Sequence, residues 1–113
     1  MTTAAAVRTL ALRLPGAEER ETWGRPTFRV GSSLFAALHD ELLILRGTPE
    51  TQAGRLAADP RLAAAPYWGR FGWVAIHLTD VTERELPQLL DAAYRLAAPA
   101  PRAPTRPRRA TSR

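Results

Sequence analysis

The sequence predicts a single α+β domain in which helices pack on one face of an antiparallel sheet. Amphipathic helical periodicity occurs near both ends of the chain, and alternating apolar residues fill the region between residues 27 and 46. The turns within that region are too short for a crossover between parallel strands. With 113 residues, of which 45% are hydrophobic, the chain is long enough to form one buried core. The expected element order is αβββαβ(β)α.

A first helix is expected over residues 3–14, where apolar side chains recur at helical spacing. The residues that share its apolar face are Val7, Leu10, Ala11 and Leu14. Pro15 and Gly16 end this helix. Residues 18–21, three glutamates and one arginine, are interpreted as a charged turn that leads into Trp23.

Three strands are expected to follow as a meander over residues 27–30, 33–39 and 42–46. Alternation in the second strand predicts that Phe35 and Ala37 lie on one face of the sheet. The opposite face of that strand is expected to hold Leu34, Ala36 and Leu38. The third strand has four consecutive apolar residues, which predicts a central strand covered on both faces.

A second helix is expected to begin after Thr48 and to run to about residue 58, because a capping hydroxyl is followed there by a proline. Its buried residues are expected to be Ala53, Leu56 and Ala57. Residues 61–66 are interpreted as a loop that connects this helix to the next strand.

A further strand is expected over residues 73–78, with Val74, Ile76 and Leu78 on one face and Trp73, Ala75 and His77 on the other. The last helix follows Thr82 and Glu85, which have the spacing of a capping box. Pro87 removes a backbone donor, so regular helix is expected to start near Leu86.

The positive charge of the chain is concentrated at its C-terminal end. The formal net charge is +5, and all 16 basic residues are arginines. Five of them follow residue 99, which leaves eleven arginines against eleven acidic residues before it. We therefore divide the chain into a neutral domain, residues 1–98, and a proline- and arginine-rich tail, residues 99–113, whose composition predicts disorder. Tail arginines that can contact phosphate groups include Arg106, Arg108 and Arg109.

Several function classes are disfavoured. There is no cysteine, and His39 and His77 have no further ligand at metal-binding spacing, so neither a metal nor a cofactor is expected. No nucleophile elbow, phosphate-binding loop or dinucleotide fingerprint occurs, and the chain is not expected to be an enzyme. Apolar runs are too short to cross a membrane, which favours a cytoplasmic protein without a membrane partner.

Two segments with the sequence Trp-Gly-Arg suggest a binding surface. If they lie side by side on the sheet, they combine aromatic rings that stack on bases with guanidinium groups that pair with phosphates. The candidate binding residues of the domain are Arg25, Arg29, Tyr67, Trp68 and Arg70. Trp23 and Trp73 are expected to be core residues, and Trp68 to be partly exposed.

An ordered set of motifs resembles the MmcQ/YjbR family over residues 5–98. The motifs are Trp-Gly-x-Pro-x-Phe at residues 23–28, the hairpin with Phe35, the segment from Tyr67 to Trp73, and Ala93-Tyr94 in the last helix. The resemblance implies a twisted antiparallel sheet in the order αβββαββα and a DNA-binding role, without a set of catalytic residues.

Three functions remain open from the sequence, of which an auxiliary role in a biosynthetic or resistance pathway has the weakest support. The first is DNA binding through the arginine and aromatic residues together with the tail. The alternative is a module that binds a protein or a small molecule and has no role with nucleic acid. A basic face separated from the acidic residues would favour DNA, whereas evenly mixed charges would favour the alternative.

Overall fold

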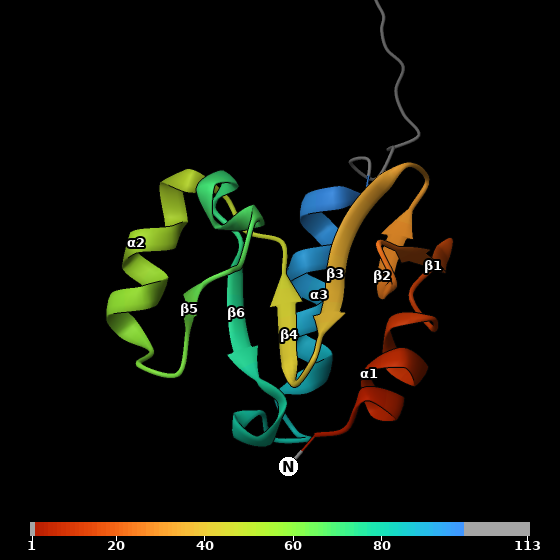
Figure 1. Cartoon of the computed structure of the whole chain (residues 1–113), viewed down its shortest axis with the longest axis horizontal. Coiled ribbons are helices and arrows are strands. Elements are labelled where there is room, and N and C mark those ends of the chain that lie inside the picture. The colour runs from red at the N-terminus through yellow and green to blue at the C-terminus, as the bar shows by residue number, and fades with distance from the viewer. Residues whose placement is uncertain (1, 99–113) are drawn as a thin grey trace, which may run out of the picture.

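Six antiparallel strands form one sheet in the order β1-β2-β3-β4-β6-β5 (Figure 1). The structure is a computed structural model that describes residues 2–98. The strands are β1 (Ala17–Thr22), β2 (Arg25–Val30), β3 (Ser33–His39), β4 (Leu42–Leu45), β5 (Ala63–Ala64) and β6 (Val74–His77). The tail prediction, including Arg106, Arg108 and Arg109, lies outside the described residues. The predicted α+β class with an antiparallel sheet is confirmed, with six strands in place of four or five.

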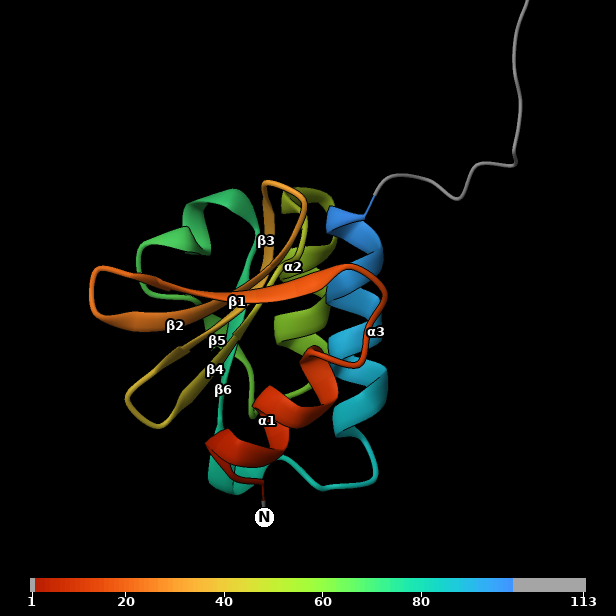
Figure 2. The same ribbon diagram turned by 90° about the vertical axis from the view of Figure 1, so that its right-hand side faces the viewer.

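Three α-helices and two short 3-10 helices connect these strands. They are α1 (Ala4–Ala11), α2 (Pro49–Ala58), η1 (Trp68–Phe71), η2 (Leu78–Asp80) and α3 (Leu86–Ala97). Figure 2 shows α1 and α3 on the same side of the sheet, with α2 beside them. Within residues 2–98, no helix has both the length and the hydropathy that a membrane crossing requires.

The main core lies between the sheet and the helices. Its largest side chains include Phe28 and Phe35 from the sheet, and α1 and α3 contribute Val7 and Leu90. Val74 and Ile76 of β6 point into this core, while Trp73 and Ala75 belong to a second, smaller cluster on the other face. The predicted alternation of residues 73–78 is therefore confirmed, and so is the central position of β4, which pairs with β3 and β6.

The charged turn predicted at residues 18–21 is wrong, because these residues belong to β1. This strand pairs with β2 along its whole length, from Ala17 opposite Val30 to Thr22 opposite Arg25. β1 is the edge of the sheet, and charged side chains on an edge strand prevent pairing with another chain. Because most residues of β1 are charged, the sequence lacks the apolar alternation by which a strand is usually predicted.

The predicted orientation of Phe35 is also wrong. Phe28 pairs with Ala36, but the next residue, Arg29, pairs with Leu34, so Phe35 is the extra residue of a β-bulge. A bulge turns its side chain away from the regular alternation. Phe35 thereby joins Ala36 in the helix-side core, where its ring meets Tyr94 of α3 edge-to-face at 5.5 Å.

The helices begin largely where their caps predict. Thr48 caps α2, and Thr82 and Glu85 exchange the two hydrogen bonds of a capping box before α3 begins at Leu86. Two expectations are corrected. The first helix ends at Ala11, before residue 14. The second buries no residue fully: Ala53 and Ala57 are exposed and only Leu56 packs against the core, because α2 lies beside the short edge strand β5.

An ion-pair network ties the end of α2 to the start of α3. The guanidinium of Arg61 contacts the carboxylates of Asp59 and Glu85, each at 2.8 Å, and also donates to the carbonyl oxygen of Asp80. The hydrogen bonds from Arg61 lower the pKa of Glu85 to about 2 and also lower the pKa of Asp59. The guanidinium of Arg61 therefore has a structural role and is not available to a ligand.

Candidate functional site

Four aromatic rings form a continuous row, and two of them, Trp68 and Trp73, belong to the cluster on the sheet face opposite α1 and α3. Trp23 meets Tyr67 edge-to-face with ring centroids 5.5 Å apart, and Tyr67 meets Trp68 in the same way at 5.4 Å. Trp68 then stacks on Trp73 at 5.4 Å with 20° between the ring planes. We call Trp23, Tyr67, Trp68 and Trp73 the aromatic row. It joins the β1–β2 hairpin to the loop before β6, so the two Trp-Gly-Arg segments are neighbours.

Trp23 lies at the tip of the β1–β2 hairpin and is not a core residue. Trp23 and Gly24 form the two-residue connection and have φ angles of 53° and 78°, as in a type I′ turn. The hairpin tip carries the ring away from the core, and 72% of the Trp23 surface is exposed. The predicted core position is therefore wrong for Trp23, whereas it is confirmed for Trp73, which is 6% exposed.

The loop that carries the other three rings is fixed against the start of α2. The side-chain amide of Gln52 donates to the carbonyl oxygens of Gly69 and Trp73, at 2.8 and 2.9 Å. Gly72, with a φ angle of 97°, lies directly against the backbone of Thr48 and Pro49, where a larger residue has no space. The position of Trp68 and Trp73 is thus set by backbone contacts with a neighbouring element.

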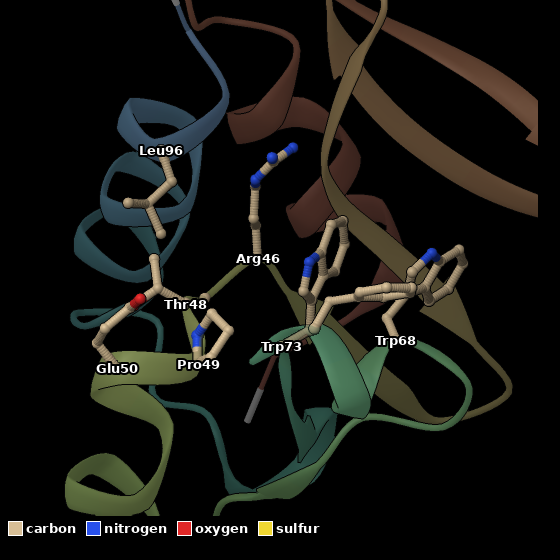
Figure 3. Close-up of a pocket in the computed structure, with 9 residues that line it drawn as sticks. Arg46, Thr48, Pro49, Glu50, Trp68, Trp73 and Leu96 are labelled. Carbon is tan, nitrogen blue, oxygen red and sulfur yellow. The ribbon is translucent and has the colours of Figure 1, made fainter.

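A pocket of about 430 Å³ opens beside the stacked tryptophans (Figure 3). It is lined by residues of α2, η1 and α3, of the segment between β4 and α2, and of the residue before β6, namely Arg46, Gly47, Thr48, Pro49, Glu50, Trp68, Phe71, Trp73 and Leu96. Figure 3 shows Arg46 between the two tryptophans on one side and Leu96 and Glu50 on the other. Its volume lies within the range of about 300–1,000 Å³ that is usual for small-ligand pockets.

Four arginines share this face with the rings. Arg46 lies over the Trp73 ring at 5.7 Å, and Arg70 lies 5.4 Å from the ring centre of Tyr67. Arg25 and Arg29 are on the same side of β2 as Thr27, which pairs with Ala37 of the second cluster. We call the four arginines, the aromatic row and Phe71 the arginine–aromatic surface.

None of these four arginines forms an ion pair with an acidic group of residues 2–98. The arginines that do pair with acids are Arg8, Arg20, Arg61 and Arg95, and they lie on α1, β1 and α3 and beyond the end of α2. The domain is neutral in total, but the guanidinium groups beside the rings form no ion pair, even where Glu50 lines the same pocket as Arg46.

The structure places the candidate residues of the domain in two groups. Tyr67, Trp68 and Arg70 come together in and beside η1, and the ring of Tyr67 is 57% exposed. Arg25 and Arg29 lie on β2 and are both half-buried rather than fully accessible. Arg29 donates to the hydroxyl of Thr22 at 3.3 Å, and its Nε atom is buried without a partner among the described residues.

Sequence reasoning missed three members of this surface: Trp23 as an exposed ring, Arg46 and Phe71. A signal for Trp23 was present, because a residue and a glycine between two pairing strands match a hairpin turn. Arg46 directly follows β4, and Phe71 ends η1; neither position has a local signal. Among residues 2–98, no three histidine, cysteine or acidic side chains are grouped so as to hold a metal ion.

Fold and surface together define a small α+β domain with aromatic rings and arginines without acidic partners grouped on one surface. The chain belongs to the YjbR family, whose model matches residues 12–96. Its fold is similar to the crystal structure of the Deinococcus radiodurans protein DR2400, a protein with the domain DUF419. The TM-score is 0.73 at 25% sequence identity, and the match covers 85% of this chain and 78% of that one. Among curated proteins, none matches this sequence significantly. The resemblance to the family is thereby confirmed.

Proposed function

We propose that this protein is a non-enzymatic, cytoplasmic DNA-binding protein that contacts its ligand through the arginine–aromatic surface. The observation that supports this proposal most strongly is the grouping of four arginines without acidic partners beside a row of aromatic rings on one face. A guanidinium without an ion pair can form bidentate contacts with phosphate. Arg46 donates one hydrogen bond to the carbonyl oxygen of Leu34 at 2.9 Å and Arg29 one to the hydroxyl of Thr22, so Arg25 and Arg70 are the most available of the four.

The tail is proposed to add to binding by this surface. Leu96, in the last turn of α3, lines the same pocket as Trp68 and Trp73, so α3 ends beside these rings. The tail brings five further arginines, and each phosphate that an arginine neutralises raises affinity at low salt. Such contacts do not depend on sequence, so the tail is expected to strengthen binding without selecting a site.

Replacing Arg25 and Arg70 together by alanine is expected to weaken DNA binding while leaving the fold intact. Loss of two phosphate contacts should reduce the slope of log affinity against log salt by about 2. The free energy of unfolding should change by less than about 1 kcal/mol, because neither side chain forms an ion pair. Fluorescence anisotropy of labelled DNA over a series of salt concentrations measures the first effect, and urea unfolding measures the second.

The matched control replaces Arg13 and Arg84 by alanine. Both are exposed, neither forms an ion pair within residues 2–98, and their loss changes the net charge by the same amount. Because they lie outside the arginine–aromatic surface, the control should retain a larger salt slope than the Arg25 and Arg70 variant. Equal slopes in the two variants would show that only total charge matters and would remove the surface from the proposal.

A second candidate function is the binding of a small molecule or a protein segment in the pocket beside Trp73. The observation that favours it is the apolar lining from Phe71, Trp73 and Leu96 around a volume large enough for a ligand. This candidate predicts that removal of Phe71 abolishes binding of the ligand and that the arginine substitutions leave it unchanged.

A further inference from the structure

The exposed rings of the arginine–aromatic surface suggest which form of DNA it takes. Five large apolar side chains of residues 2–98 are exposed, and three of them are aromatic residues of this one surface: Trp23, Tyr67 and Phe71. In a duplex the bases are already stacked on one another. In a single strand they offer free aromatic faces, on which protein rings stack.

The backbone at Trp23 and Tyr67 gives a second reason. Both residues have positive φ angles, 53° and 66°, a region that bulky residues rarely adopt. Strain of this kind persists where the surrounding structure enforces it and is concentrated at functional sites. At a type I′ turn the favoured dipeptide is Asn-Gly, so Trp23 stands where asparagine would suit the hairpin better.

The pocket supplies a third reason. It opens at the end of the aromatic row, between Trp73 and Phe71, and the guanidinium of Arg46 lies 5.7 Å from the ring centre of Trp73. A base that has left its stack can enter a pocket of this size and lie against aromatic side chains, and a paired base cannot. Arg46 lines this pocket, and Arg70 lies beside the rings of Tyr67 and Phe71, so each has a guanidinium near a ring on which a base could stack.

We propose that the arginine–aromatic surface selects single-stranded over double-stranded DNA, with unpaired bases stacked on Trp23, Tyr67 and Phe71. This inference rests on the proposed function, because it names the form of DNA that the same surface binds. It requires rings that are exposed and arginines beside them that lack acidic partners. Trp23, Tyr67 and Phe71 are exposed, and Arg70, which forms no ion pair, lies over the rings of Tyr67 and Phe71. It also gives a role to Trp23, whose exposed ring does not belong to either hydrophobic cluster.

The test uses the full chain and a labelled DNA strand of about 16 nucleotides, alone and annealed to its complement. The decisive variant is Trp23→Asn, which removes the ring and creates the dipeptide that the turn prefers. We expect the melting temperature to rise and the affinity for the single strand to fall between about 5-fold and 150-fold. Binding to the duplex should change less. Phe71→Ala, a second exposed ring of the surface, should weaken single-strand binding in the same direction.

Leu12→Asn is the control, because Leu12 is exposed at the end of α1, outside the surface, and should leave both affinities unchanged. Equal or tighter binding of the duplex would overturn the preference for single strands and leave the proposed function standing. Absence of binding to either form would overturn both. A lower melting temperature for Trp23→Asn with unchanged affinity would make Trp23 a packing residue and would also overturn the inference.

Discussion

Gly72→Ala is expected to destabilise the domain by at least about 4 kcal/mol, among the larger effects of a single substitution. Gly72 has a φ angle of 97°, which a residue with a Cβ atom rarely adopts. A Cβ atom there would also overlap the backbone of Thr48 and Pro49, and backbone atoms cannot move aside as a flexible side chain can. The variant must either unfold or separate the loop of Trp68 and Trp73 from α2. Urea unfolding followed by tryptophan fluorescence measures the loss.

Gly54→Ala is the matched control, and its expected effect has the opposite sign. Gly54 lies within α2, it is exposed, and no atom lies within 4 Å of the place where a Cβ atom would be. Alanine favours the helix over glycine by about 1 kcal/mol, so the variant should be more stable than the natural protein. If Gly72→Ala were as stable as Gly54→Ala, the close contact between the loop and α2 would be incorrect.

Trp73→Ala is expected to cost about 3–5 kcal/mol of unfolding free energy. The ring is almost fully buried, stacks on Trp68 and packs against Ile44 and Ala75 in the smaller cluster. Its removal leaves a cavity that the neighbouring alanines are too small to fill. Trp68 would lose its stacking partner, so the variant should bind DNA more weakly even under conditions where it is folded.

Phe71→Ala is the matched control for Trp73→Ala, because it removes a neighbouring aromatic ring that is exposed. Phe71 is about half exposed, so its removal should cost less than about 1.5 kcal/mol. Comparing the urea unfolding midpoints of Trp73→Ala and Phe71→Ala therefore tests whether Trp73 is a buried core residue. A midpoint for Trp73→Ala close to that of Phe71→Ala would contradict the burial of Trp73 and the packing of the smaller cluster.

The parts of the fold that the sequence predicts correctly are those with a local signal. Thr48 before Pro49, and Thr82 three residues before Glu85, set the helix starts through hydrogen bonds between residues close in the chain. Alternation from Val74 to Ile76 identifies the buried face of β6, because a half-buried strand repeats every two residues.

The parts that the sequence fails to predict depend on pairing between distant residues or on a break in the alternation. β1 has no apolar pattern, and its strand conformation comes from hydrogen bonding with β2. The face of Phe35 is reversed by a bulge that only the register with β2 reveals. Trp23 is typical of a core residue by type, but a two-residue turn directs it into solvent.

The candidate site likewise has parts with a local sequence signal and parts that depend on contacts between distant residues. Tyr67, Trp68 and Arg70 are close in sequence, and their grouping could be predicted. The contact between Trp23 and Tyr67 joins residues 44 positions apart and depends on the order of the strands in the sheet. Arg46 reaches the surface only because β4 pairs with β6, which places the end of β4 beside Trp73.

We propose that the domain itself, and not only its basic tail, binds DNA. The most direct measurement is an anisotropy titration of labelled single-stranded DNA with the full chain and with a full-length variant in which the five arginines after residue 99 are glutamine. Both proteins are titrated at low and at physiological salt. We expect the tail variant to bind more weakly and with a smaller salt slope, but still to bind, and to lose affinity further when Arg25 and Arg70 are also replaced. Loss of all binding in the tail variant at low salt would contradict a DNA site on the arginine–aromatic surface.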